Sequence, residues 1–299
     1  MGQGTDSSCA ETLSLSDPID QMVSLAAAQT YPRFVTTDII DDRLIGALHV
    51  RALTHSGLEH DVAEEHTVVQ AGTLEALMSG GYDGDATLAE VLRLGTLGIG
   101  TVQALDGELI VIDGAAWSAH ADGTVERLDL SVMTPFAVVT PFSPTATRSV
   151  SMPLDFDALH DALDDMAPAN APVIAVRIDG VFTDLVLRSV ERQSKPYKPL
   201  REVVAHQSEW RVERCTGTVV GFRFPDATAG IEVPGHHLHF LSEDKTLGGH
   251  IMSIALEHGE LAVDPCHDLH VELPPGMALG QPGTVDRSEI AKIEGGTNR

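Results

Sequence analysis

Residues 235–251 read GHHLHFLSEDKTLGGHI, a stretch that contains four histidines. In an extended strand, successive side chains point to opposite faces. His237 and His239 therefore lie side by side on one face, while His236 points to the other. The stretch predicts a strand that presents two neighbouring imidazoles on a single side.

The rest of the stretch indicates how a third ligand could join this pair. The charged residues and double glycine within Leu241–Gly249 favour a turn, so the chain returns as a hairpin and brings His250 opposite the pair. Three converging imidazoles are the usual open zinc arrangement. Glu243 is the alternative, because His237, His239 and Glu243 fit the cupin metal motif H-x-H-x-x-x-E. We favour His250, since Glu243 lies in an apparent exposed turn and the second cupin segment, P-x-G-x-x-H, does not occur.

Outward from this stretch, the chain reads as strands and turns with a few helices, which is a mixed α/β or α+β fold. Asp-Gly pairs at 106–107, 113–114 and 122–123 predict turns between strands. Val173–Val190 is interpreted as a hairpin around Asp179-Gly180, and Glu209–Phe224 as two strands around Gly217. Helices are predicted over Pro18–Gln29, Leu88–Leu94 (with Thr87 and Glu90 as a capping box), Leu154–Met166 and Asp286–Glu294.

Length and composition favour division into parts. We expect residues 1–65 to be an acidic, partly disordered N-terminal extension and 66–170 an N-terminal α/β subdomain. Residues 171–299 are then a C-terminal sheet subdomain that carries the metal site, with a tail that completes it. The hydrophobic content of 43% in 299 residues is enough for a substantial core.

Charge and targeting signals exclude several classes of protein. Lys and Arg number 19 against 44 Asp and Glu, a net charge of −25, which argues against nucleic-acid and anionic-membrane partners. The three cysteines are widely separated, so neither a disulfide framework nor a cysteine zinc site is expected. Without a secretory signal or a long apolar run, we expect a cytoplasmic protein. Exposed strand edges would allow a homodimer.

Three further charged residues could take part in chemistry. Glu108 shares a strand face with apolar residues, so it is either at the solvent edge or functional. Arg188 begins a basic run that continues to Arg201, which is either a locally neutralised surface or a pocket for an anionic substrate. Glu294 ends the predicted terminal helix, where a carboxylate is mildly disfavoured by the helix dipole.

Several stretches, taken in order, resemble the α-acetolactate decarboxylase family from about Val68 to the C-terminus. These are ALMSGGYDGD (76–85), LGIGT (97–101), LDGELI (105–110), KPYKPL (195–200) and the segment from Val233 to His250. The resemblance implies a fold of two sheet-containing domains with mixed and antiparallel strands. It also implies a carboxy-lyase that converts 2-acetolactate to acetoin and CO2, in acetoin biosynthesis and the butanediol pathway.

The resemblance also implies how the site is built. Zinc is expected on His237, His239 and His250, chelating the hydroxyl and ketone oxygens of the substrate and stabilising an enediolate that is then protonated. The catalytic residues implied are Arg188, Glu108 and Glu294. Arg188 also binds the substrate, together with Thr101. The competing hypotheses are a cupin-like metal-dependent binder of a small acid or sugar, and an oligomerisation protein with incidental histidines.

Overall fold

The computed structural model describes residues 39–54, 64–273 and 279, and the fold concerns these residues. The predicted helices at Pro18–Gln29 and Asp286–Glu294, and with them Glu294, lie outside the described residues. Within the described residues, none of the helices has the length and apolar character needed to cross a membrane.

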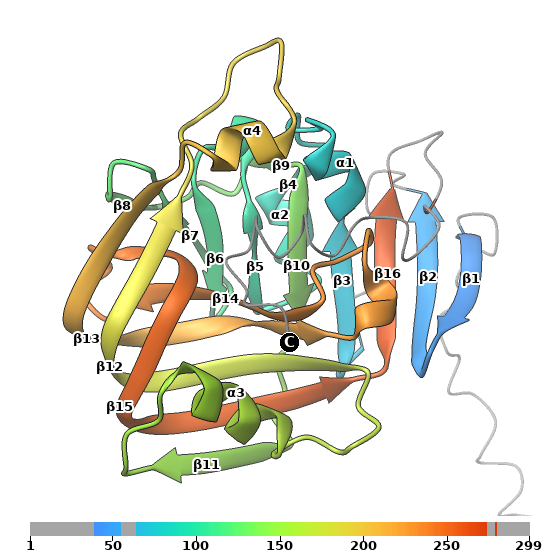
Figure 1. The fold of residues 1–299 in the computed structure, drawn as a ribbon. Helices are drawn as coiled ribbons and strands as arrows, with labels where there is room; N and C mark the ends of the chain where they lie inside the picture. The colour runs from blue at the N-terminus through green and yellow to red at the C-terminus, as the bar shows by residue number, and fades with distance from the viewer. Residues whose placement is uncertain (1–38, 55–63, 274–278, 280–299) are drawn as a thin grey trace, which may run out of the picture. The chain divides into compact units, whose positions relative to one another are not determined.

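The first sheet of the described chain has nine strands in the order β1-β2-β16-β3-β10-β5-β6-β7-β8 (Figure 1). Its strands are β1 (Ile39–Ile45), β2 (Leu48–Thr54), β3 (Thr67–Ala71), β5 (Leu97–Thr101), β6 (Glu108–Ile112), β7 (Ala115–Ala119), β8 (Val125–Arg127), β10 (Phe136–Thr140) and β16 (Asp268–Leu273). Strand β16 pairs in parallel with β2 and β3, whereas the other pairings are antiparallel. The sheet is therefore mixed, as expected.

The second sheet is antiparallel and contains the histidine-rich stretch. Its strands are β11 (Ala146–Val150), β12 (Val173–Ser189), β13 (Ser208–Phe224), β14 (Gly235–Ser242) and β15 (Gly248–Cys266). Strand β14 pairs with both β13 and β15, and β12 pairs with the same two strands. These pairings close β12, β13, β14 and β15 into a ring, which brings the ends of four strands to one place.

Two predicted turns in this sheet are wrong. Strand β12 runs straight through Asp179-Gly180, and β13 runs straight through Gly217. Gly180 pairs with Gly217 on one side and with Gly259 on the other. A Cβ atom on Gly180 would lie 2.6 Å from the His258 carbonyl oxygen, so these glycines permit close approach of neighbouring strands and do not form turns.

The helices are short, and the remaining elements are small. Helix α2 begins after Thr87, whose side chain and Glu90 form the predicted capping box. The prediction over Leu154–Met166 is confirmed as α3. The elements outside the two large sheets are α1 (Leu74–Met78), α2 (Leu88–Val91), α3 (Phe156–Asp164), α4 (Leu200–Val204), the 3-10 turns η1 (Gln103–Leu105) and η2 (Asp226–Thr228), and the strands β4 (Ala86–Thr87) and β9 (Met133–Thr134).

The two large sheets share a hydrophobic core. Ile99 and Ile110 of the first sheet belong to the same buried cluster as Val220 and Phe222 of β13. Each such side chain contributes about 1.5–3 kcal/mol on burial. This packing holds the ends of β14 and β15 against β6.

The division of the chain at residues 65 and 170 stays a prediction. Residues 39–54 form β1 and β2, two strands of the first sheet. Strand β16, which comes from the C-terminal part of the chain, lies between β2 and β3. The first sheet is therefore assembled from segments on both sides of position 170.

Candidate metal centre and pocket

Three buried histidines converge at the end of the second sheet. The imidazoles of His237, His239 and His250 each offer one ligand atom, and these atoms lie within 4.8 Å of one another. The ring centroids are 5.0 to 5.4 Å apart. The side chain of His239 is 1% exposed and that of His250 is 2% exposed. The predicted triad is therefore brought together away from bulk water.

The predicted hairpin produces this convergence. His239 pairs directly with His250 across β14 and β15, and His237 lies two residues earlier on the same face. His250 also pairs with Arg188 of β12 on its other side. Gly249 has φ +149°, and a Cβ atom there would lie 2.9 Å from the Arg188 carbonyl oxygen. The double glycine allows β15 to start close against β12.

His239 shows which of its nitrogens could bind a metal ion. Its Nδ1 lies 2.8 Å from the carbonyl oxygen of Leu109 in β6. A carbonyl can only accept, so Nδ1 donates and Nε2 keeps its lone pair. Nε2 is buried and has no hydrogen-bond partner among the described residues. A second-shell carbonyl of this kind orients a metal-binding imidazole, so the donor set fits a zinc ion.

Burial favours the neutral form of His237 and His239. Desolvation, with the nearby Arg188 as a smaller cause, lowers the pKa of His237 to about 3. Desolvation and then the neighbouring His237 hold the pKa of His239 well below its usual range. A neutral imidazole is the form that binds a metal ion, so these two histidines are in the metal-binding form at neutral pH.

A buried ion pair lies beside the triad. Arg188 Nη1 is 3.2 Å from Glu108 Oε1, and the other carboxylate oxygen of Glu108 is 3.6 Å from His239 Nε2. Glu108 is 8% exposed and Arg188 is 5% exposed, so both charges are largely removed from water. Glu108 is therefore buried in the site, and the alternative of a solvent-edge carboxylate is wrong.

A pocket opens beside these charges. Its polar side carries Thr101, Glu108, Arg188 and His237. The rest of the lining is Leu74 and Leu77 of α1, Leu200 and Val204 of α4, and Gly100, Leu105, Phe136 and Val190. The pocket thus joins a charged wall to an apolar wall, as suits a small ligand that has both kinds of group.

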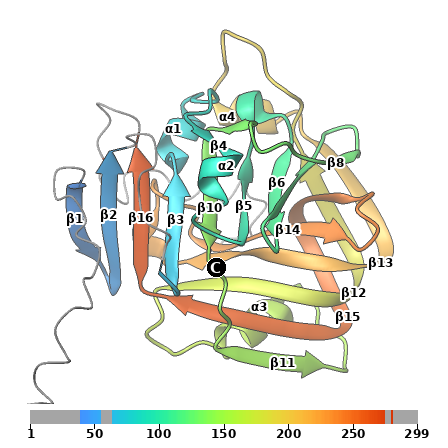
Figure 2. The ribbon, with the colours of Figure 1, turned by 180° about the vertical axis from the view of Figure 1, so that it is seen from behind.

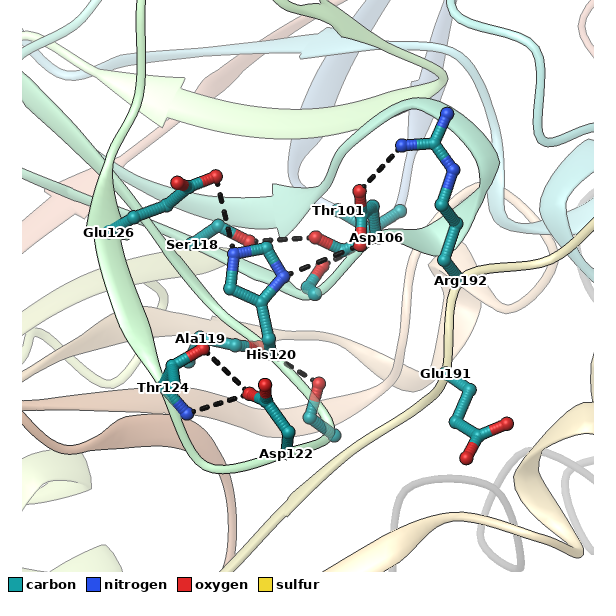
Figure 3. Close-up of polar contacts among 12 residues, drawn as sticks. Thr101, Asp106, Ser118, Ala119, His120, Asp122, Thr124, Glu126, Glu191 and Arg192 are labelled. Atoms are coloured by element: carbon teal, nitrogen blue, oxygen red, sulfur yellow. Dashed lines mark hydrogen bonds and ion pairs between the residues drawn. The ribbon is translucent and has the colours of Figure 1, made fainter.

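The turn before β6 holds Glu108 in place. Ser118 Oγ donates to the carbonyl of Asp106, and Thr101 Oγ1 donates to the carbonyl of Gly107, both at 2.9 Å. Figure 3 shows the Asp106 carboxylate between Arg192 and His120. Arg192 Nη1 is 2.7 Å from Asp106 Oδ2. This ion pair connects the chain after Arg188 to the turn that precedes Glu108.

The predicted basic patch does not act as one surface. Of its members, Arg188 lines the pocket, Arg192 pairs with Asp106, and Lys195 Nζ lies 2.6 Å from Asp83 Oδ2. Glu243, the alternative ligand, is exposed in the turn after β14 and is not part of the triad. Of the basic run, Arg188 is thus the member that lines the pocket, together with Thr101, Glu108 and His237.

The sequence patterns did not predict several other parts of the site. The apolar lining comes from α1, α4 and β10, whose leucines, valines and phenylalanine look like ordinary core residues in the sequence. The Leu109 carbonyl that orients His239 carries no sequence signal, because any residue supplies one. Asp106 had a signal, since it belongs to a turn motif directly before Glu108.

Comparisons with known proteins agree with this fold. The family model for alpha-acetolactate decarboxylase matches residues 68–279. The alpha-acetolactate decarboxylase of Methylococcus capsulatus is 40% identical over 211 residues, covering 71% of this chain and 81% of that protein. The crystal structure of the Bacillus subtilis strain 168 enzyme superposes with a TM-score of 0.72 at 33% identity, covering 77% of this chain and 99% of that one.

Fold, pocket and matches together define an enzyme of the decarboxylase class, a carboxy-lyase acting on a small molecule. The match spans most of the chain and includes every described residue of the charged wall and the triad. The chain belongs to the alpha-acetolactate decarboxylase family.

Proposed function

We propose that this chain converts 2-acetolactate to acetoin and CO2 with a zinc ion held by His237, His239 and His250. The observation that carries the proposal is the convergence of three buried imidazoles with Glu108 and Arg188 at one pocket. When bound, the zinc ion supplies a Lewis acid that polarises the hydroxyl and ketone oxygens of the substrate. Neutral imidazole ligands leave its full positive charge available for this.

Arg188 binds the carboxylate of the substrate. Its guanidinium is always charged, and its planar fork can pair with both carboxylate oxygens. Glu108 contacts one end of this fork through Nη1, which orients the guanidinium within the pocket. The apolar wall receives the two methyl groups of 2-acetolactate and keeps water from the reacting carbons. Thr101 lines the same pocket beside Glu108.

Glu108 is the group placed to carry the proton. Loss of CO2 leaves an electron pair on carbon, and this carbon must take up one proton to give acetoin. The Glu108 carboxylate lies between Arg188 and His239, at 3.2 and 3.6 Å, and so adjoins both the carboxylate-binding group and the triad. A catalytic role for Glu294 stays a prediction, as do a cytoplasmic location, a homodimer and a place in the butanediol pathway.

Metal removal tests the proposal. Dialysis against a chelator should abolish CO2 release and acetoin formation from 2-acetolactate, and added zinc should restore both. His250→Ala should lose the bound metal, whereas Glu243→Ala, the matched control in the same hairpin, should keep it. Metal content is measured by elemental analysis. Full turnover in the metal-free protein, or metal loss on Glu243→Ala alone, contradicts the proposal.

A further inference from the structure

Two segments that the proposed chemistry leaves unused lie against each other. Ser79–Asp85, which reads SGGYDGD, follows α1, and Lys195–Leu200, which reads KPYKPL, leads into α4. Figures 1 and 2 both show α1 and α4 at the same end of the first sheet, where the chain between β12 and α4 also lies. The contacts between these segments are specific, and they come from two consecutive residues, Tyr82 and Asp83.

Tyr82 makes the buried contact. Its side chain is 0% exposed, and its hydroxyl donates to the carbonyl oxygen of Lys198 at 2.8 Å. The ring lies 5.1 Å from that of Tyr197, centroid to centroid. Gly80 has φ +93°, and a Cβ atom there would be 3.3 Å from the same Lys198 carbonyl oxygen. The glycine is needed for this close approach of the two segments.

Asp83 makes the charged contact. Its carboxylate accepts from Lys195 Nζ at 2.6 Å, from Gln103 Nε2 at 2.8 Å and from the Tyr197 hydroxyl at 3.1 Å. The Lys195 ammonium is the main reason that the pKa of Asp83 lies below its usual value. Asp83 thus joins the α4 segment to the α1 segment and to η1.

These contacts lie where they can set the spacing of the apolar wall. Leu74 and Leu77 of α1 line the pocket and come just before the first segment. Leu200, the last residue of the second segment, lines it together with Val204 of α4. The two helices are also in contact. Moving the segments apart would therefore separate the parts of the apolar wall that α1 and α4 supply, while Arg188 and the triad stay on the sheet.

We propose that Tyr82 and Asp83 are positioning residues that hold α1 and α4 together and thereby fit the apolar wall to the small alkyl groups of the substrate. This inference rests on the proposed function. A single methylene in an apolar pocket changes specificity by roughly 10- to 200-fold, so a small displacement of this wall is measurable. Neither residue touches the reacting atoms, so binding should suffer more than the chemical step.

The kinetic test uses the zinc-loaded full-length protein. Tyr82→Phe removes only the hydroxyl, and Asp83→Asn removes only the charge. Each should raise KM for 2-acetolactate by about fivefold with kcat within about twofold of wild type. The second quantity to measure is the selectivity ratio, which is kcat/KM for 2-acetolactate divided by kcat/KM for its homologue with an ethyl group in place of methyl at C2. Each variant should change this ratio by about threefold or more. Asp83→Glu should restore the wild-type ratio.

The matched control is Glu257→Gln, which removes the charge of a half-buried carboxylate that pairs with Arg214 at 2.8 Å outside the pocket lining. It should leave KM, kcat and the ratio unchanged. An unchanged KM and ratio in Tyr82→Phe and Asp83→Asn overturns the inference, as does a fall in kcat at constant KM.

Hydrogen exchange separates this inference from the proposed function. Backbone amides of residues 190–204 should exchange about fivefold faster in both variants than in wild type or the control, measured by mass spectrometry. If wild type does not decarboxylate 2-acetolactate but the variants exchange faster, the proposed function fails and the contact between α1 and α4 stands. If exchange is unchanged, the inference is overturned whatever the activity.

Discussion

At the scale of single residues, Arg188 and Glu108 form the most consequential pair. Both charges are buried, and removing one partner of such a pair leaves the other with less compensation in a poorly solvated place. Their contact also sets the orientation of the guanidinium that faces the pocket. The pair thus serves the site more than the stability of the fold.

Arg188→Lys should lower kcat/KM for 2-acetolactate by roughly 100-fold or more, because a point charge cannot reproduce the planar fork. The matched control is Arg214→Lys. The Arg214 side chain is 58% exposed and lies outside the pocket lining, so exchanging it should change kcat/KM by less than about threefold. Wild-type activity in Arg188→Lys would refute the assigned role.

His160 of α3 makes stability depend on pH. Its ring stacks on that of His236 at 4.2 Å and packs against Phe156. Burial, followed by the charge of His236, lowers the pKa of His160 to about 3 in the folded protein. The unfolded chain therefore binds one more proton than the folded one between pH 6.5 and 3, so stability is full above this window and falls as pH drops through it.

His160→Gln should remove this dependence. Between pH 7 and pH 5, the free energy of unfolding should fall further in wild type than in the variant. For a pKa shift of this size, the two falls should differ by about 2 kcal/mol. Urea unfolding at both pH values measures the difference. Equal losses in the two proteins would show that His160 is not held neutral by the fold.

At the scale of elements, the start of β15, directly after the turn from β14, is the critical feature. Gly249 adopts φ +149°, which L side chains rarely occupy, and an added Cβ would meet the Arg188 carbonyl oxygen and the Trp210 ring. The next residue is His250, so strain at Gly249 is passed directly to the triad.

Gly249→Ala should weaken zinc binding by about tenfold or more and destabilise the fold by about 1–3 kcal/mol, because the backbone must move to relieve the contact. Gly114→Ala is the control, since Gly114 also has positive φ (+73°) but nothing lies within 4 Å of the added Cβ. It should lower stability without changing zinc affinity, as measured by competition with a chelator. Equal zinc affinity in the two variants would contradict this role for Gly249.

The strands also show where sequence patterns mislead. Asp113-Gly114 and Asp122-Gly123 do connect neighbouring strands, β6 to β7 and β7 to β8. Asp179-Gly180 has the same two residues, yet lies in the middle of β12. Gly180 differs from the turn glycines in its neighbours, because it pairs with Gly217 and Gly259 on the two adjacent strands. Local composition cannot distinguish a turn glycine from one required by close strand packing.

At the scale of the whole described chain, β16 links distant parts of the sequence. It lies between β2 and β3, and Leu269, Val271 and Leu273 are each 0% exposed. The edge strand β1 and its neighbour β2 therefore depend on β16 for their attachment to the rest of the first sheet.

Leu269→Ala should cost about 2–5 kcal/mol, the usual range for a fully buried leucine, and should speed hydrogen exchange in β2. Met152→Ala is the control, because Met152 is 74% exposed and its loss should change stability by less than about 0.5 kcal/mol. Denaturant unfolding and mass spectrometry measure the two effects. Unchanged exchange in β2 would show that β1 and β2 are held by other contacts.

The sequence alone was sufficient for the features that depend on local periodicity. Strand alternation placed His237 and His239 on one face, the glycine-ended turn returned His250 to them, and Thr87 with Glu90 marked the start of α2. Family resemblance added the substrate and singled out Arg188 and Glu108. The predictions of local structure were confirmed because each depends on residues a few positions apart, whereas the substrate and the roles of Arg188 and Glu108 stay proposals.

The tertiary structure was needed for contacts between residues that lie far apart in the sequence. Sequence could not show that Glu108 is buried against Arg188, that the Leu109 carbonyl orients His239, or that Tyr82 meets Lys198. Burial and pairing are properties of segments that meet only after the sheets have packed. A carboxylate at the end of a strand looks the same in sequence whether water or a guanidinium faces it, and only packing distinguishes the two.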